Sequence, residues 1–329
     1  MGKYYMNPSS ILVSVIVITY NSEKYIIETL NSVKNQTYNN IELIISDDGS
    51  TDNTYILCKQ WMENNSKRFN RSLLLYSKIN TGVPGNCNRG VKAAFGDWVK
   101  FIAGDDLLLP NAIEDAVSFI INCPENIEIF DSKVKIYNET VNYQIGLFDF
   151  SKSNFYTKCN SANYQFKIYC NNIYKLRIIS TVGVFIKRSL ILELNGFNEK
   201  YKLLEDTPFF QKVLKYGVRF YYLDKETVIY RKHENALSVN KSKNGEVLTQ
   251  FSIIAQKYIE DELYRYCTII NKIDIIWFKY MTNLVLKLGN KGFIASKIFR
   301  IAQIITPSKT FLKLSNIVNK ILNKNLINN

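Results

Sequence analysis

Two pairs of adjacent aspartates are the residues in this sequence best suited to chemistry. Asp47-Asp48 opens the run Asp-Asp-Gly-Ser-Thr-Asp, and Asp105-Asp106 follows Gly104 at the end of an apolar run. Mg²⁺ and Mn²⁺ prefer oxygen ligands, and proteins often hold such a metal through one or two carboxylates plus the phosphates of a substrate. The alternative is that each pair is a solvated turn, because Asp and Gly are ordinary turn residues.

The segments before both pairs read as buried parallel strands. Residues 13–19 form a continuous β-branched run, residues 41–46 lead into the first pair, and residues 98–103 lead into the second. We expect a further strand at 72–77 and intervening helices at 23–33, 51–64 and 84–95. Another helix should begin at Pro110. This alternation predicts a doubly wound, mostly parallel α/β sheet. Ligands bind beyond the carboxyl ends of such strands, so both pairs should face one cleft.

Four segments in order resemble the signature of the family-2 glycosyltransferases. They are Val-Ser-Val-Ile-Val-Ile-Thr-Tyr-Asn at 13–21, Ser-Asp-Asp-Gly-Ser-Thr-Asp at 46–52, Asn-Thr-Gly-Val-Pro-Gly-Asn-Cys-Asn-Arg-Gly at 80–90, and Ala-Gly-Asp-Asp at 103–106. Each is weak alone, whereas the four in this order and spacing are specific. The resemblance implies the GT-A nucleotide-diphospho-sugar transferase fold and an inverting single displacement at the anomeric carbon.

The same resemblance gives roles to residues on the donor side. Thr19, Tyr20 and Glu23 would line the nucleoside pocket, and Asp48 would hydrogen-bond the uracil of a UDP-sugar. Asp105 would contact the ribose or the sugar. These residues all lie in or next to the four segments, so the resemblance places the nucleotide in the first third of the chain.

A metal and the diphosphate complete the implied donor site. Asp106, with Asp105, would ligate Mn²⁺ or Mg²⁺, which would stabilise the leaving nucleoside diphosphate as a Lewis acid. The chain's single histidine, His233, lies in Tyr-Arg-Lys-His-Glu-Asn-Ala-Leu-Ser, which resembles the family's Arg-x-His-x-x-x-x-Ser region. That likeness makes Arg231 and His233 contacts of the diphosphate or the metal. A lone histidine is otherwise an ordinary surface or core residue.

Two positions depart from the family's pattern. Many members carry an acid where this chain has Ala103, so Asp105 and Asp106 must supply the acidic motif alone. The family often has Arg where this chain has Cys87, which leaves open whether Arg89 takes over a phosphate contact.

An inverting transferase also needs a base that takes the proton of the acceptor hydroxyl. Glu205-Asp206, at the start of a helix predicted at 205–216, resembles the family's Glu-Asp pair at the acceptor edge of the cleft. We predict that Asp206 is the base, with Glu205 as the second candidate. The competing interpretation is that both acids favour a helix N-terminus, whose dipole attracts negative charge.

Between 131 and 175 the pattern loosens into a Tyr-, Phe- and Asn-rich stretch that we read as irregular. Its aromatic residues suit either stacking on an acceptor sugar or packing in a core. The second half of the domain resumes regular structure with a predicted strand at 180–187 and short strands at 219–223 and 228–231.

The net charge of +13 is concentrated in the last part of the chain. From Arg265 onward, eleven Lys and Arg residues face a single acid, Asp274, within apolar, helical-looking sequence. Such helices bind anionic membrane surfaces, and the alternative is a solvated appendage or an oligomer contact. We therefore expect a GT-A catalytic domain at 1–238, with a donor half at about 11–110 and an acceptor half at about 111–238, and a basic amphipathic helical tail at 239–329.

The compartment follows from what the sequence lacks. Its six cysteines form no CxxC pair or disulfide-like spacing, and neither a secretory signal nor a spanning helix is evident. We expect a cytoplasmic protein, peripheral at the inner face of the cell membrane.

The segments at 80–90 and 101–111 most resemble bacterial surface-polysaccharide enzymes. Those enzymes move glucose or galactose from a UDP-sugar, in β-1,3 linkage, to GlcNAc or GalNAc on undecaprenyl diphosphate, as in O-antigen and lipopolysaccharide synthesis. Two other classes compete: a metal-dependent nucleotidyltransferase, which also needs paired acids, and a basic nucleic-acid-binding protein. The second is disfavoured because the positive charge lies in an apolar-rich tail away from the core, so we expect no nucleic-acid partner.

Overall fold

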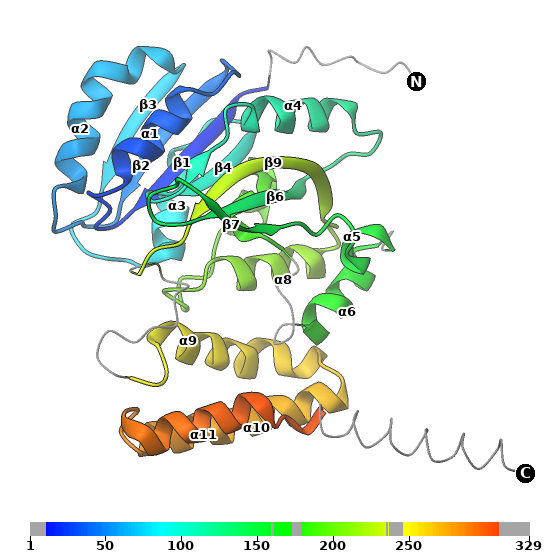
Figure 1. Cartoon of the computed structure of the whole chain (residues 1–329). Coiled ribbons are helices and arrows are strands. Elements are labelled where there is room, and N and C mark those ends of the chain that lie inside the picture. Colours follow the sequence, from blue (N-terminus) through cyan, green and yellow to red (C-terminus); the bar gives the residue numbers. More distant parts are fainter. Residues whose placement is uncertain (1–10, 159–160, 173–178, 235, 237–245, 309–329) are drawn as a thin grey trace, which may run out of the picture. The chain divides into compact units, whose positions relative to one another are not determined.

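The computed structural model describes residues 11–158, 161–172, 179–234, 236 and 246–308 (Figure 1). The chain forms two compact units, Met1–His233 and Glu234–Asn329. The catalytic and membrane roles that we assign to 1–238 and 239–329 stay predictions.

Four parallel strands form one half of the sheet in the first unit. β1 (Val13–Thr19) lies between β2 (Ile41–Asp47) and β4 (Trp98–Ala103), and β3 (Arg71–Tyr76) flanks β2. Nearly all residues of β1 and β2 are buried, as expected of apolar strands covered on both faces. Because both aspartate pairs follow strands that flank β1, they lie at the same edge of the sheet (Figure 1).

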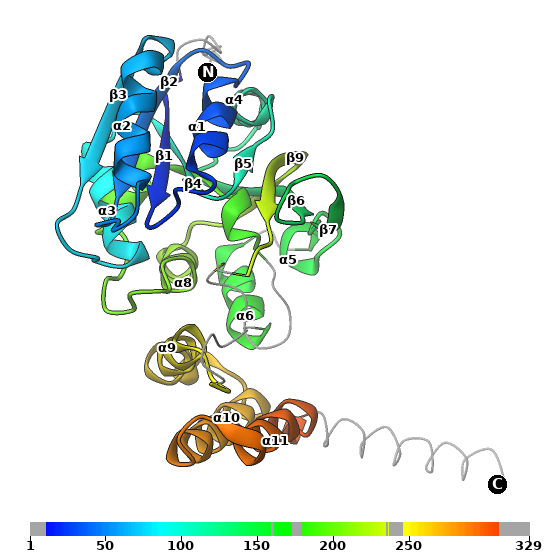
Figure 2. The same cartoon turned by 60° about the vertical axis from the view of Figure 1, so that its left-hand side comes forward.

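Helices cover both faces of these strands (Figure 2). One apolar cluster joins β1 and β2 to helices near the predicted positions: α1 (Ile26–Lys34), α2 (Thr54–Asn65), and α4 (Ala112–Asn122), which begins just after Pro110. The opposite cluster contains α3 (Val83–Ala93), α7 (Arg188–Glu193) and α8 (Asp206–Tyr216). The short 3₁₀ helix η2 (Ser66–Arg68) extends α2.

The sheet continues beyond β4 with strands of both directions. β8 (Phe185–Lys187) is antiparallel to β4, and β6 (Ile129–Tyr137) is antiparallel to β8. β9 (Tyr221–Arg231) runs parallel to β6 and pairs with β5 (Leu107–Leu108) at the far edge. Within the described residues the sheet is therefore mixed: β1 to β4 form a continuous parallel half, and the other half combines antiparallel pairs with the parallel pair of β6 and β9.

The stretch at 131–175 contains more regular structure than its sequence indicates. Beyond β6 it holds β7 (Gln144–Phe148), α5 (Asn154–Thr157) and α6 (Ala162–Asn172). Apolar alternation is lost in β6 because Asp131 and Ser132 are polar and yet fully buried. The two short strands predicted at 219–223 and 228–231 are likewise parts of β9, and the strand predicted at 180–187 is reduced to β8.

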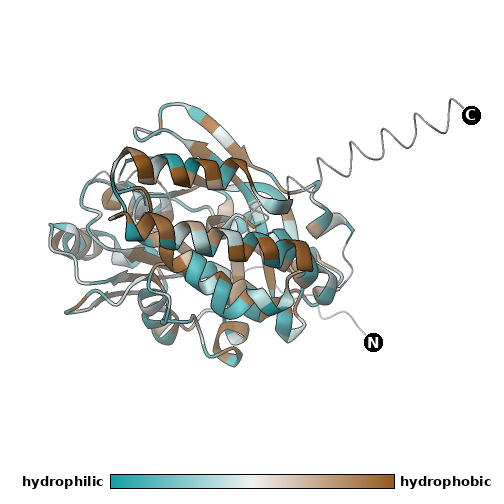
Figure 3. Ribbon diagram, turned by 90° about the horizontal axis from the view of Figure 1, so that it is seen from below, coloured by the Kyte–Doolittle hydropathy of each residue, from teal (hydrophilic) through white to brown (hydrophobic). Residues whose placement is uncertain are grey.

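The second unit is helical, as predicted. It comprises α9 (Gln250–Tyr258), α10 (Ile269–Lys287) and α11 (Gly292–Ile304), with the turns η4 (Ile259–Leu263) and η5 (Tyr264–Tyr266) between the first two. Its small core joins Leu248, Val285 and Ala295. Among the described residues, no helix is long and apolar enough to cross a membrane. Figure 3, coloured by hydropathy, shows apolar and polar residues alternating along these helices.

Candidate active site

Asp48 organises the turn that leads into α3. One of its carboxylate oxygens accepts hydrogen bonds from the backbone N–H groups of Thr81 (3.0 Å) and Gly82 (2.8 Å). The other accepts from Thr81 Oγ1 (2.6 Å) and Arg89 Nη2 (2.9 Å). The carboxylate is thus enclosed by protein donors. Its predicted contact with uracil stays a prediction.

Arg89 and Cys87, where the chain departs from the family's pattern, both have contacts within the protein, and a phosphate contact of Arg89 stays open. Arg89 Nη1 donates to Asn86 Oδ1 (2.9 Å), while Nη2 pairs with Asp48. Cys87 is buried in the apolar cluster beneath α3. Arg89 therefore contacts the Asp48 turn, and Cys87 packs in the apolar core.

The loop after β1 is joined to the start of α2. Asn21 Oδ1 accepts from the Thr51 N–H (2.8 Å), and Glu23 Oε2 accepts from the Asn53 N–H (3.0 Å). Tyr20, next in the loop, is about half exposed. The predicted nucleoside-pocket residues Tyr20 and Glu23 therefore lie in one loop that is hydrogen-bonded to the start of α2. Their contacts with a nucleoside stay predictions.

The second aspartate pair meets the end of β9. Asp106 is 1% exposed, and its Oδ1 accepts from the backbone N–H of Arg231 at 2.9 Å. Asp105 Oδ2 lies 2.8 Å from His233 Nε2. Burial, and then the charge of Asp105, raise the pKa of the Asp106 carboxyl well above its ordinary value. Four predicted site residues that lie far apart in the sequence are thus brought together.

Arg231 holds this corner from inside. Its side chain is 2% exposed. It donates from Nε to the Asp105 carbonyl (2.8 Å), from Nη1 to the Glu139 carbonyl (2.6 Å) and from Nη2 to Glu28 Oε2 (2.6 Å). The guanidinium also lies 4.7 Å from the centre of the Tyr25 ring. The geometry makes Arg231 a support of the Asp105 loop, whereas its predicted diphosphate contact stays a prediction.

Two buried polar atoms at this corner lack hydrogen-bond partners in the described part of the chain, Thr19 Oγ1 and His233 Nδ1. Thr19 ends β1, and a Cβ added to Gly104 would lie 2.8 Å from its Oγ1, so the hydroxyl adjoins the Asp105 loop. The His233 ring packs against Tyr25, with centroids 4.8 Å apart. Buried polar groups are rarely left unpaired, and both atoms fit the role of ligand contacts.

The donor set at this corner fits Mg²⁺ or Mn²⁺. Two carboxylates and an imidazole are hard or borderline ligands of the kind these ions accept. Among the described residues, no group of three or more His, Cys, Asp and Glu side chains is arranged around a metal position. A metal held by Asp105 and Asp106, with substrate phosphate oxygens as further ligands, stays a prediction.

The acceptor-side acids lie at the start of α8. Asp206 Oδ2 accepts from Thr181 Oγ1 (2.6 Å), and Oδ1 accepts from the N–H (2.5 Å) and the hydroxyl (3.0 Å) of Thr207. Burial, and then the charge of Asp206, raise the pKa of Glu205 to about 8. Glu205 therefore holds its proton at neutral pH, which favours Asp206 as the proton acceptor.

The donor and acceptor sides meet around α3. Val83, the first residue of α3, donates its N–H to the carbonyl of Lys202 (2.9 Å), three residues before Glu205. Burial raises the pKa of the Cys87 thiol, and the charges of Glu205, Asp48 and Asp206 raise it further. Carboxylates from both sides thus lie near one buried side chain. The sequence separates them by more than a hundred residues.

Several supporting residues escaped the sequence reasoning. Tyr25, Glu28 and Glu139 hold Arg231, and Thr181 binds Asp206, but none belongs to the four family segments. Lys100 did carry a signal, because a charged residue in the apolar run 98–103 must either reach the surface or find a buried partner.

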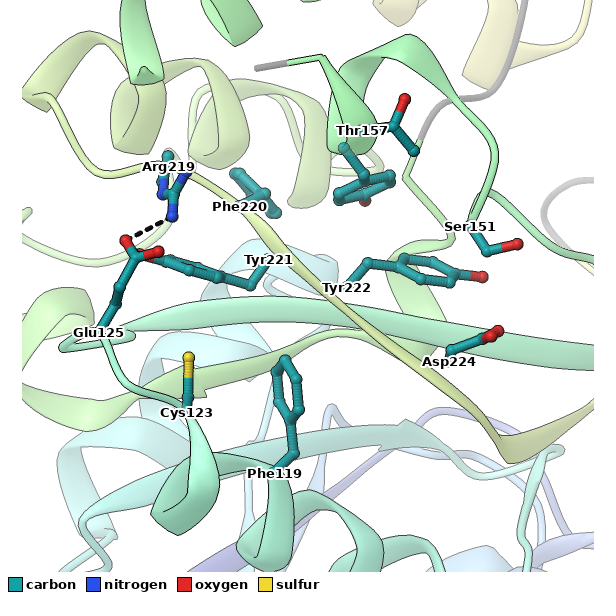
Figure 4. A pocket seen from close by; sticks show the side chains of 11 residues that line it. Phe119, Cys123, Glu125, Ser151, Thr157, Arg219, Phe220, Tyr221, Tyr222 and Asp224 are labelled. Carbon is teal, nitrogen blue, oxygen red and sulfur yellow. Dashed lines mark hydrogen bonds and ion pairs between the residues drawn. The ribbon is translucent and has the colours of Figure 1, made fainter. Parts of the chain in front are cut away.

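A separate hollow of about 420 Å³ lies at the other end of β9 (Figure 4). Tyr221, which begins β9, lines it, whereas Arg231, which ends β9, contacts Asp105. Its rim includes the ion pair of Arg219 with Glu125. It contains none of the predicted site residues, so the aspartate corner is the candidate active site.

Comparisons with known proteins show the family of this chain. The model of glycosyl transferase family 2 matches residues 14–194. An uncharacterized glycosyltransferase of Haemophilus influenzae is 30% identical over 231 residues, which cover 69% of this chain and 67% of that protein. WfaP of Escherichia coli, a UDP-Glc:alpha-D-GlcNAc-diphosphoundecaprenol beta-1,3-glucosyltransferase, is 27% identical over 244 residues, covering 74% of this chain and 85% of WfaP.

Solved structures show the fold. TarS 1–349 of S. aureus in complex with UDP-GlcNAc has a TM-score of 0.54 at 24% identity, covering 80% of this chain and 70% of that one. Another structure of the same fragment has a TM-score of 0.51 at 27% identity, covering 67% of this chain and 60% of that one. The predicted GT-A fold is confirmed. With a family match across more than half of its length, the chain belongs to glycosyl transferase family 2.

Proposed function

We propose that the protein transfers glucose or galactose from a UDP-hexose, with inversion, to GlcNAc or GalNAc on undecaprenyl diphosphate. The product would carry a β-1,3 linkage and enter a bacterial surface polysaccharide such as O-antigen. Family membership and the likeness to WfaP support a sugar transferase of this kind. The single observation that carries the proposal is the corner where Asp105, Asp106 and His233 meet beside the unpaired hydroxyl of Thr19.

On the donor side, each group has a distinct task. Thr19, Tyr20 and Glu23 form the rim that receives the nucleoside, with Asp48 beside it. His233 Nδ1 offers the diphosphate or a metal a contact, while Nε2 stays bound to Asp105. When bound, Mg²⁺ or Mn²⁺ supplies Lewis-acid stabilisation of the leaving diphosphate. Arg231 keeps the Asp105 loop fixed during this exchange.

On the acceptor side, Asp206 accepts the proton of the attacking hydroxyl. Its two oxygens are oriented by Thr181 and Thr207, so the carboxylate presents a defined direction to the acceptor. Glu205, protonated at neutral pH, gives Asp206 a neutral neighbour. A fixed base near its substrate is what general base catalysis requires.

The second unit suits a membrane-bound acceptor. Lysine and arginine side chains alternate along α10 and α11 with exposed apolar ones, among them Ile269, Ile273, Ile276, Tyr280, Phe293 and Ile294. Apolar insertion combined with positive charge is how helices bind anionic membrane surfaces. We propose peripheral attachment at the inner face of the cell membrane. Flotation with vesicles containing phosphatidylglycerol, compared with phosphatidylcholine alone, tests it, and equal recovery in both would contradict it.

The decisive experiment is a donor screen. The full chain, with Mn²⁺, is offered UDP-glucose, UDP-galactose and UDP-GlcNAc against synthetic GlcNAc- and GalNAc-diphospho-lipids, and the linkage is determined by NMR. We expect release of UDP and a β-1,3-linked hexose from one of the first two donors. Transfer of an N-acetylhexosamine, a retained α configuration, or nucleoside triphosphate consumption with release of pyrophosphate would each refute the proposal.

A further inference from the structure

The turn before β8 is built on buried polar groups. This turn is the 3₁₀ helix η3 (Thr181–Gly183), preceded by Ser180. Asp131 of β6 is fully buried and accepts hydrogen bonds from the N–H (2.8 Å) and the hydroxyl of Ser180. Ser132 Oγ donates to the Gly183 carbonyl (2.8 Å). Both ends of the turn are thus fixed to β6.

A buried lysine holds the same turn from β4. Lys100 is fully buried, and its Nζ donates to the carbonyl oxygens of Val182 and Val184. Burial lowers its pKa to about 7, against the opposing effect of the negative charge of Asp131. The strand that ends at Asp105-Asp106 therefore also supports the turn on the acceptor side.

The backbone of the turn is held in a conformation that side chains seldom adopt. Thr181 has φ of 20°. A Cβ added at Gly183 would overlap Ser180 Oγ and lie 2.7 Å from Asp131 Oδ1, so the turn has no room for a side chain there. Such conformations persist where the surroundings over-determine them, and they cluster at functional sites. Here the hydrogen bonds of Asp131, Ser132 and Lys100 supply that constraint.

Thr181 is the residue that this turn presents to the site. Its Oγ1 lies 2.6 Å from Asp206 Oδ2. Around Asp206 also lie Glu205, the Cys87 thiol on α3 and the Tyr169 hydroxyl on α6, each of which responds to its charge. The Thr181 hydroxyl thus donates a hydrogen bond to Asp206 from the turn that precedes β8.

We infer that Thr181 is a positioning residue for the base Asp206, and that buried Lys100 and Asp131 hold Thr181 in place. The inference rests on the proposed function, in which Asp206 takes the acceptor proton. A hydrogen bond to one carboxylate oxygen fixes its orientation, and small errors in the placement of a reacting group cost large factors in rate.

The test compares three threonine variants of the full chain with UDP-hexose and the synthetic diphospho-lipid. Thr181→Val removes the hydroxyl and keeps the β-branched shape. Thr181→Ser keeps the hydroxyl. Thr37→Val is the matched control, because Thr37 Oγ1 also donates to a carboxylate at 2.6 Å, Glu114 Oε2, outside the site.

We expect Thr181→Val to lower kcat by about 10- to 100-fold, the loss typical of a hydrogen bond to a charged group. KM for the donor should stay unchanged. Thr181→Ser should recover most of the turnover, and Thr37→Val should match the wild type. Normal kcat in Thr181→Val, or no recovery in Thr181→Ser, would overturn the inference.

A double-mutant cycle separates this inference from the proposed function. In the Asp206→Asn background, Thr181→Val should cause almost no additional loss, because the group that it positions is already gone. A full additional loss would mean that Thr181 acts only on the fold and would overturn the inference. If Asp206→Asn itself transfers at the wild-type rate, the base assignment fails first and the inference falls with it.

Discussion

Asp48 on the donor side and Asp206 on the acceptor side are held in different ways. On the donor side, Asp48 is bound by Thr81, Gly82 and Arg89, which all belong to one contiguous segment. On the acceptor side, Asp206 is bound by Thr181, whose turn depends on residues in β4 and β6. The first arrangement is local to recognisable motifs, whereas the second is assembled from scattered positions.

This difference teaches where variation is tolerated. The Asp48 turn is held by contacts within one short segment, two of them from backbone N–H groups, so its shape depends on few side chains. An acceptor base held through a chain of buried polar contacts depends on each member, since an unpaired buried charge is costly. The acceptor half can therefore diverge with substrate only if the buried support is rebuilt.

The largest expected effect breaks the donor side alone. Asp106→Ala should lower metal-dependent transfer by about 10⁴-fold, because it removes a carboxylate next to the leaving diphosphate. Turnover is measured with increasing Mn²⁺. Circular dichroism and the melting temperature check that the fold survives, since Asp106 Oδ1 also accepts from the Arg231 N–H.

Asp106→Asn is the control for that structural contact. Its amide oxygen can still accept from Arg231, while its affinity for a hard cation is lower. If both variants transfer normally, Asp106 is not the metal ligand.

The next effect breaks the acceptor side. Asp206→Asn should lower kcat by about 10³-fold, within the range expected for loss of a general base, and leave UDP affinity unchanged. Calorimetry of UDP binding together with steady-state kinetics provides the measurement. Glu205→Gln, as the neighbouring control, should keep most of the turnover because Glu205 already holds its proton at neutral pH. The opposite ranking of the two variants would transfer the base role to Glu205.

The sequence predicted that both aspartate pairs lie at one edge of the sheet, for a physical reason. Continuous apolar runs at 13–19 and 98–103 identify buried parallel strands, and parallel strands deliver the residues that follow them to one edge. Asp105 and Asp106 could therefore be placed before any fold was known. Their neighbours His233 and Arg231 were placed by resemblance, because they reach the corner through the end of β9.

The acceptor side was harder because its supports leave no periodic signal. Asp131 interrupts the apolar alternation of β6, so that strand was read as irregular. Lys100 stands out in an apolar run, yet its partners are the carbonyl oxygens of Val182 and Val184, which any residue type would provide. Contacts to backbone atoms of distant segments cannot be inferred from residue identities alone.

A third prediction concerns the contact between the start of α3 and Lys202, where the donor and acceptor sides meet. Gly82 has φ of 85°, and a Cβ there would overlap the carbonyl oxygen of Lys202. Gly82→Ala should therefore lower the free energy of unfolding by about 2–4 kcal/mol, through backbone strain and the displaced segment. Gly217→Ala is the matched control, since Gly217 has φ of 103° with nothing within 4 Å of the added Cβ.

The control should cost about 1 kcal/mol, from the left-handed backbone alone. Denaturant unfolding of both variants measures the difference. Equal losses would mean that the contact between α3 and Lys202 does not hold the two sides together.

The smallest effect concerns the charge of the acceptor pair. The pKa of Glu205 is raised from 4.5 to about 8 in the folded chain, so the folded protein keeps a proton that the unfolded chain releases between these values. Its contribution to stability is therefore lost as pH rises from about 4.5 to 8.

The variant Glu205→Gln has no such proton. Its melting temperature should lie a few degrees above that of the wild type at pH 8.5 and nearly equal it at pH 4.5. Thermal melts at both pH values measure this, with Glu63→Gln, exposed on α2, expected to show no pH-dependent gain. A gain of equal size at both pH values would point to packing instead, and the raised pKa of Glu205 would then not account for the stability of the acceptor pair.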